Sequence, residues 1–225
     1  MLKELFAIFQ KDTLMDRAYR RSFLMLDITR SMFLTAMTSL RQTDNSDMEI
    51  DIYDKDIEVN RYEREVRRNV FNHLAVGGTE KLPSGLVLVS IIIDIERIGD
   101  YAKNMVELAM NHPKRLDGGK FEADLCRVEA AVEEDFTRTR ECFERADGDA
   151  AQQLLTEYEW VSRVCDHCLF ALVKEEDKSI GSGDAVALAL YFRWLKRINS
   201  HLRNITTSVV NPFDRIGFKP KHARE

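Results

Sequence analysis

Four oxygen-bearing side chains in two segments have the spacing of ligands on a helix surface. Glu96 and Asp100 stand four residues apart, and so do Asp56 and Asn60. Side chains at this spacing on a helix lie about 5 to 6 Å from each other, so each pair can present two ligands on one face. If two such faces pack together, the oxygens repel each other unless a cation neutralises them. The pattern therefore predicts a site for iron, manganese, magnesium or calcium, with zinc also compatible.

A second interpretation of the same residues needs no metal. The acids can be solvated, or they can pair with basic residues of the same segments, such as Arg61, Arg97 and Lys103. Neither motif contains a His, which disfavours a di-iron site built from Glu and Glu-x-x-His motifs. From spacing alone, the metal site and the ion-paired surface both stay open.

Other residue types that could do chemistry are less organised. Cys165 and Cys168 flank Asp166 and His167, but no second ligand pair follows at zinc-finger spacing, so we expect helix-core or partly exposed thiols. The five His residues are scattered, and we expect His201 on a helix surface. No nucleophile and base are paired in a recognisable pattern. The sequence therefore predicts a protein that is not an enzyme.

The elements that must position these residues are long helices. Apolar residues recur at three- and four-residue spacing through most of the chain, which is typical of amphipathic helices. Gly77, Pro113 and Gly148 mark breaks, while Ser84 and Asp184 are expected N-caps. The expected helices span about 11–41, 47–76, 84–111, 121–147, 150–177 and 184–210. Helices of this length joined by short turns pack antiparallel.

The chain also repeats itself at an offset of 100 residues. Residues 97–105 align with residues 197–205, with Arg, Ile and Asn in register. Three helices in each half predict an all-α fold of two tandem antiparallel three-helix bundles. The second copy carries Lys196 and Ser200 where the first carries its two acids. Only the first half is therefore expected to keep the acidic pair.

This organisation divides the chain into three parts. The first bundle, with a short N-terminal extension, is expected at 1–113, the second bundle at 114–211, and a C-terminal tail at 212–225. The tail can be a docking segment or a strap packed on the second bundle.

Composition narrows the class of protein. Hydrophobic residues make up 44% of the 225 residues and charged residues 32%, which is typical of a packed, well-solvated chain. The net charge of −5 disfavours nucleic-acid binding, which needs a basic face. The longest uncharged run, 82–93, is shorter than the about 20 residues of a membrane-spanning helix. We expect a cytoplasmic protein that reaches a membrane only through a partner or a surface helix.

At one segment the residues carry a family resemblance. The run Glu96-Arg97-Ile98-Gly99-Asp100, continued to Asn104, resembles the signature of the PhoU family. The similarity extends over about residues 12–210. It implies two tandem three-helix bundles, in agreement with the repeat and the helix count.

The resemblance also implies a metal. Some PhoU-family proteins bind multinuclear clusters, iron in particular, through pairs of Glu/Asp-x-x-x-Asp motifs. Glu96 and Asp100 match one motif of the first pair. Asp56 and Asn60 match the other, although Asn replaces the usual second acid. The second bundle, with its altered motif, is expected to have lost its site.

The function that the resemblance implies is regulation of phosphate uptake and phosphate homeostasis. The implied partners are a phosphate transporter, of the ABC type or a sodium/phosphate cotransporter, and a sensor histidine kinase, and the chain can form a homo-oligomer. Two alternatives come from other classes of protein. One is a metal-dependent helical-bundle enzyme, and the other is a metal-free structural interaction protein.

Overall fold

The computed structural model of the chain describes residues 13–43, 51–77, 81–112 and 114–220. Within these ranges the regular structure is helical. The α-helices are α2 (Leu14–Gln42), α3 (Ile52–Gly77), α4 (Leu82–Asn111), α5 (Glu122–Arg145), α6 (Gly148–Glu157), α7 (Glu159–Val173) and α8 (Ser182–Val210). Two short 3₁₀ turns, η2 (Gly119–Phe121) and η3 (Phe213–Arg215), stand at the start of the second half and after its last helix.

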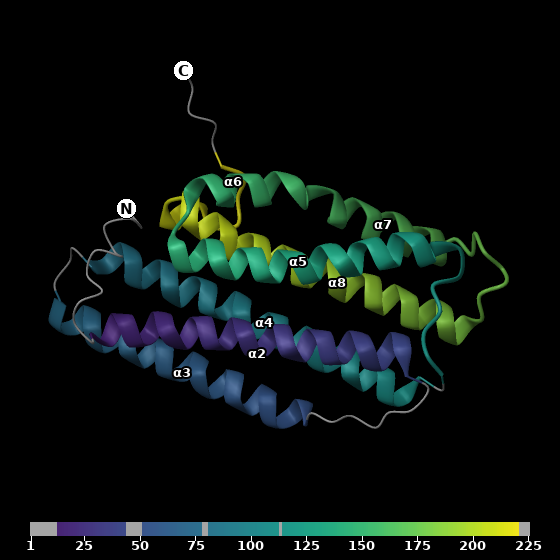
Figure 1. Cartoon of the computed structure of the whole chain (residues 1–225), viewed down its shortest axis with the longest axis horizontal. Coiled ribbons are helices and arrows are strands. Elements are labelled where there is room, and N and C mark those ends of the chain that lie inside the picture. The colour runs from purple at the N-terminus through teal and green to yellow at the C-terminus, as the bar shows by residue number, and fades with distance from the viewer. Residues whose placement is uncertain (1–12, 44–50, 78–80, 113, 221–225) are drawn as a thin grey trace, which may run out of the picture.

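The helices form two layers that lie side by side along the long axis of the molecule (Figure 1). Helices α2, α3 and α4 pack on one another in the first layer, and α8 packs against α5, α6 and α7 in the second. The layers meet mainly where α4 contacts α8, with a further contact between α2 and α5. The predicted all-α fold of two antiparallel three-helix bundles is confirmed.

Local sequence explains where most helices begin. Helix α2 starts at a capping box, in which the Thr13 hydroxyl accepts the Asp16 backbone N–H at 3.2 Å and the Asp16 carboxylate accepts the Thr13 N–H at 3.0 Å. The expected N-cap at Ser84 is wrong, because α4 begins two residues earlier with a proline in its first turn. The Ser84 hydroxyl instead donates to the Lys81 carbonyl at 3.0 Å.

The expected N-cap at Asp184 is also wrong. Helix α8 begins at Ser182 after Gly181, so Asp184 lies inside its first turn. Its carboxylate accepts a hydrogen bond from His112 Nε2 at 3.0 Å and lies 3.2 Å from Lys114 Nζ. The Asp184 side chain therefore binds residues from the first half of the chain and not the backbone at the start of α8.

The fifth predicted helix, 150–177, is divided into α6 and α7 at Tyr158. The Tyr158 backbone leaves helical geometry at φ −98° and ψ 13°, and its buried ring lies under the Arg138 guanidinium, 5.7 Å from the ring centroid. No Gly or Pro marks this position. The break therefore follows from tertiary contacts that helix propensity does not register.

The two bundles share one continuous apolar core. Phe33 of α2 packs on Phe136 of α5 with ring centroids 5.3 Å apart, and Phe23 packs edge-on to Phe143 at the same distance. All four rings are buried. Because aromatic pairs of this kind contribute about 0.5–1.5 kcal/mol beyond the area they bury, they resist separation of the two bundles.

The described part of the tail folds back on the end of α8. The Gly217 N–H donates to Thr207 Oγ1 at 2.8 Å, and Asn211 Nδ2 donates to the Phe218 carbonyl at 2.7 Å. These contacts favour the strap over a free docking segment for residues 212–220. Residues 221–225 lie outside the described ranges.

Among the helices described, none combines the length and the apolar character that crossing a bilayer requires.

Candidate metal centre

The predicted ligands Asp56 and Asn60 lie on α3 and face Glu96 and Asp100 on α4. The two helices pack against each other along their length. A side chain absent from the predicted set joins the two faces, because Lys103 Nζ lies 2.9 Å from Asp56 Oδ2 and 3.4 Å from Asp100 Oδ1. The sequence prediction that these acids share one surface therefore holds in the structure, with an ammonium group between them.

Lys103 is held in place by both charge and hydrogen bonds. Its side chain is about one-fifth exposed, and that of Asp56 is less exposed still. Burial by itself lowers the pKa of Lys103. The hydrogen bond and negative charge of Asp56, together with Asp100, outweigh burial and leave that pKa raised. The ammonium is thus charged at neutral pH and supplies positive charge where a bound cation would sit.

Glu96 is an acid of the cluster whose pKa is raised by its surroundings. Burial raises its pKa, the negative charge of Asp100 raises it further, and Arg97 opposes both. Arg97 Nε lies 3.7 Å from Glu96 Oε2, and its NH1 donates to Asp100 Oδ2 at 3.2 Å. A second cation therefore lies along the α4 side of the acidic pair.

The Asn60 amide donates hydrogen bonds within its own helix. Its Nδ2 donates to the Asp56 carbonyl at 3.0 Å and lies 3.4 Å from Asp56 Oδ2. These bonds fix the Asp56 carboxylate against α3. They also orient the Asn60 side chain, whose remaining ligand atom is Oδ1.

The residues present do not fit a resident metal ion as they stand. Two carboxylates that would be ligands, those of Asp56 and Asp100, already bind the Lys103 ammonium. Across the described ranges, no group of three or more His, Cys, Asp or Glu side chains is arranged to hold a metal ion. The predicted metal at Asp56, Asn60, Glu96 and Asp100 stays a prediction.

The second bundle has a simpler ion pair of the same kind at a different position of the repeat. Lys196, which occupies the repeat position of Glu96, places Nζ 2.6 Å from both carboxylate oxygens of Asp166 on α7. The Ser200 hydroxyl donates to the Lys196 carbonyl at 2.8 Å and so is committed to its own helix. A lysine of the third helix again binds a carboxylate of the second.

A polar network between the bundles was missed by sequence reasoning. Asp94 of α4 accepts hydrogen bonds from His201 Nδ1 at 2.6 Å and from Asn204 Nδ2 at 2.8 Å, both on α8. The Tyr101 and His201 rings stack with centroids 5.7 Å apart, and Arg197 Nε donates to the Tyr101 hydroxyl at 3.3 Å. The two repeat segments thus pack directly against each other, which only their internal symmetry could have suggested.

The expectation that His201 lies on a helix surface is wrong, because the residue is only 7% exposed. Arg197 NH2 lies 3.3 Å from its Nε2. Since a guanidinium can only donate, Nε2 must accept, and the ring donates to Asp94 through Nδ1.

The second bundle also buries a carboxylate. Asp135 of α5 accepts the Thr139 hydroxyl at 3.0 Å and Asn199 Nδ2 at 3.0 Å. Burial raises the pKa of Asp135 to about 7, against hydrogen bonds and the charges of Arg203 and Arg138 that lower it. Oδ1 of Asn199 is buried without a partner.

The cysteines behave as core thiols. Cys165 and Cys168 are buried and free, as predicted. Burial raises their pKa values to about 12 and about 11. Thiols with such pKa values are poor nucleophiles and poor metal ligands at neutral pH.

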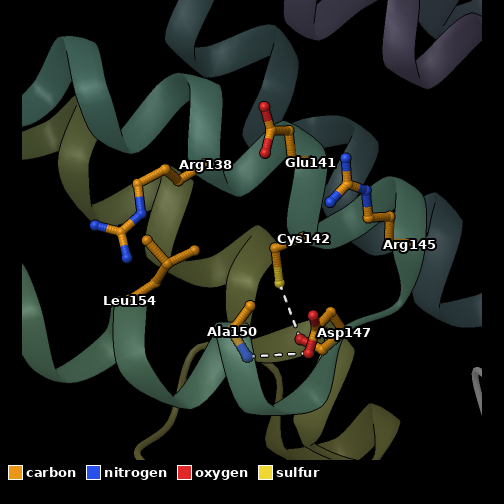
Figure 2. A pocket seen from close by; sticks show the side chains of 7 residues that line it. All are labelled: Arg138, Glu141, Cys142, Arg145, Asp147, Ala150 and Leu154. Carbon is orange, nitrogen blue, oxygen red and sulfur yellow. Dashed lines mark hydrogen bonds between the residues drawn. The ribbon is translucent and has the colours of Figure 1, made fainter.

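A small pocket of about 90 Å³ lies between the end of α5 and the start of α6 (Figure 2). Asp147 caps α6 inside it, accepting the backbone N–H of Ala150 at 3.1 Å, while Cys142 Sγ donates to the Asp147 carbonyl at 3.2 Å. Arg138 is bound to Glu157 at 2.8 Å. Because the chain's own groups satisfy this helix end and Arg138, the pocket offers no reactive constellation.

The fold and these closed charge clusters define an all-α protein built from two packed three-helix bundles. Residues 24–109, which cover most of the first bundle, match the family model described as the PhoU domain. The match identifies residues 24–109 as a PhoU domain, as the signature in α4 predicted. A comparison with curated proteins finds no match.

Solved structures agree with the fold over most of the chain. The crystal structure of PhoU from Pseudomonas aeruginosa has a TM-score of 0.78 at 20% identity, with 88% of this chain and 95% of that chain covered. The phosphate transport system regulatory protein PhoU from Streptococcus pneumoniae has a TM-score of 0.75 at 13% identity, with 87% and 93% covered. At these identities, the similarity establishes the fold.

Proposed function

We propose that this chain regulates phosphate uptake as a helical adaptor for a phosphate transporter. The observation that carries the proposal is the match of residues 24–109 to the PhoU domain. The similar protein from Streptococcus pneumoniae is described as a regulatory protein of a phosphate transport system. A sensor histidine kinase as a further partner, a location in the cytoplasm and a homo-oligomeric state belong to the same proposal.

The physical character of the molecule supports an adaptor. The two bundles share one core, so the body can present fixed surfaces to a partner. Cations of the chain itself offset most of the negative charge of the cluster on α4, and Lys196 on α8 balances the carboxylate that it contacts. The proposal therefore needs protein–protein contact and no chemical step, and it does not depend on the predicted metal.

Exposed apolar side chains gather at the hairpin end of each bundle. Phe71 is 71% exposed near the end of α3, and Leu86 is 38% exposed in the first turns of α4. In the second bundle Phe170 is 56% exposed near the end of α7, and Val186, at the repeat position of Leu86, is 60% exposed. We take these ends as the surfaces that contact the transporter, since exposed aromatic residues are typical anchors of interfaces.

Phosphate uptake in cells of the source organism tests the proposal. Removing the chain should release uptake from restraint when external phosphate is plentiful, and the parent chain should restore the restraint. A Phe71→Ser and Phe170→Ser double variant should not restore it. Leu24→Ser, which alters an exposed apolar residue of α2, is the matched control and should restore it. Uptake that is unchanged by removal of the chain, at both low and high phosphate, would contradict the proposed function.

The partner is tested separately. Cross-linking in intact cells followed by purification of the tagged chain should recover a phosphate transporter subunit or a sensor histidine kinase. Recovery should fall for the double variant and persist for Leu24→Ser. The mass of the purified chain in solution reports its oligomeric state.

A further inference from the structure

We infer that lysine ammonium groups of the chain itself take the place of bound metal ions in both bundles, and that removing Lys103 creates a divalent-cation site. The two halves share the type of contact but not its repeat position, because Lys103 aligns with Arg203 and Lys196 aligns with Glu96. A lysine from the third helix of the bundle reaches across to a carboxylate on the second helix. This inference goes beyond the proposed function and does not depend on it.

In the first bundle the ammonium bridges two helices. Lys103 Nζ lies 2.9 Å from Asp56 Oδ2 on α3 and 3.4 Å from Asp100 Oδ1 on α4. An ammonium carries three N–H donors and a full positive charge, so it can satisfy carboxylates of both helices at once. Its position between them is the position that a bridging cation would need.

In the second bundle the ammonium is opposed by a single carboxylate. Lys196 Nζ lies 2.6 Å from both oxygens of Asp166. Ser200, at the repeat position of Asp100, brings no charge. One positive and one negative charge balance here, so a divalent ion would find no deficit to fill.

The charge balance of the first cluster explains why removal of Lys103 should favour binding of a divalent ion. The acids Asp56, Glu96 and Asp100 face the cations Arg97 and Lys103, which leaves a local charge of −1. The negative charge of Glu63 also reaches Glu96, but Arg67 balances it at 2.7 Å. Without Lys103 the local charge becomes −2, the charge that a divalent ion neutralises. The side chains of Asp56 and Asp100 would also lose the partner that now occupies their oxygens, and carboxylates are the ligands that hard cations prefer.

A tethered ammonium also competes with free metal ions. A metal ion can enter only if it displaces Lys103 and leaves a partly buried ammonium near a dication, which costs free energy. The competing group is part of the chain and needs no association step. The parent chain should therefore bind Mn²⁺ weakly, although three acids lie close together.

The test compares variants of the full chain, purified with chelator and then titrated with Mn²⁺. Lys103→Met keeps the apolar stem of the side chain but removes the charge. It should bind one Mn²⁺ at least about tenfold more tightly than the parent, because loss of a buried ion-pair partner shifts affinities by that order. Lys103→Arg keeps the charge and is the matched control, which should resemble the parent. Binding is read from the electron paramagnetic resonance signal of free Mn²⁺.

Thermal unfolding supplies a second readout. Mn²⁺ should raise the midpoint of Lys103→Met but not that of the parent, since only a state that binds the ion is stabilised. Adding Asp100→Asn to Lys103→Met should abolish both effects.

Three results would overturn the inference. The first is equal Mn²⁺ affinity in the parent and Lys103→Met, and the second is a gain that survives Asp100→Asn. The third is a Lys103→Met chain that stays unfolded with and without Mn²⁺, because no cation then replaces the ammonium.

Discussion

The buried carboxylate of Asp135 should make the stability of the protein depend on pH in a direction opposite to that of a salt-bridged acid, whose pKa is lowered by folding. Burial raises the pKa of Asp135 from its ordinary value of 3.8 to about 7. Between these values the folded chain holds a proton that the unfolded chain has released. The folded state binds more protons there, so the free energy of unfolding falls as the pH rises from about 4 to about 7, and the effect of Asp135 is constant above that range.

The size of the effect follows from the same two values. A difference of about three pH units corresponds to about 4 kcal/mol at most, at 1.36 kcal/mol for each unit. Asp135→Asn cannot ionise and so escapes this penalty. It keeps an acceptor for the Thr139 hydroxyl, and its amide can donate to Asn199 Oδ1 if the Asn199 amide turns over, since that oxygen has no partner now. Loss of attraction to Arg203 and Arg138 reduces the gain, so about 1–3 kcal/mol is expected near pH 8.

Urea unfolding of the parent and Asp135→Asn at several pH values between 4.5 and 8.5 measures this difference. All other titrating groups are common to the two chains, so subtraction isolates Asp135. The free energy of unfolding of Asp135→Asn should rise steadily relative to that of the parent up to about pH 7, and the difference should then stay constant. A difference that does not change with pH, or a parent that becomes the more stable chain above pH 7, would refute the reasoning.

Two further predictions concern the bundle junction and the second charge cluster. Asp94→Ala removes the acceptor of His201 and Asn204, so it should lower the free energy of unfolding by about 2–4 kcal/mol. Asp94→Asn keeps an acceptor and should lower it by less. Urea unfolding at pH 7 measures both changes, and equal losses in the two variants would contradict this prediction. Lys196→Glu combined with Ser200→Asp places two new carboxylates beside the α7 carboxylate that now binds Lys196. This double variant should therefore bind Mn²⁺ more tightly than the parent in titration. No gain over the parent would show that α7 supplies no ligand.

The fold was largely predictable because its signals are local. Three- and four-residue apolar spacing indicates a helix wherever it occurs, and the repeat gives the arrangement of helices twice. The errors lie where distant residues intervene. Asp184 was expected to cap α8 but binds His112, and Tyr158 interrupts a helix where Arg138 packs on its ring. No periodicity within a segment contains such partners.

The candidate site was predictable only in part for the same reason. The spacing of Glu96 and Asp100 showed which face of α4 is acidic, and Asp56 does lie opposite it. Which cation neutralises that face depends on how far the flexible side chain of Lys103 reaches toward another helix. Asp94 and His201 are 107 positions apart in the sequence, so no pattern around either residue predicts their contact.

If the chain's own lysines take the place of metal ions, the protein should be nearly free of metal, and elemental analysis measures this. The full chain should be purified from its own cells without chelators, and its iron, zinc and manganese should be measured against protein concentration. We predict well below one metal ion per chain. One or more ions of a single metal per chain, retained through purification and lost in Asp100→Asn, would contradict the account.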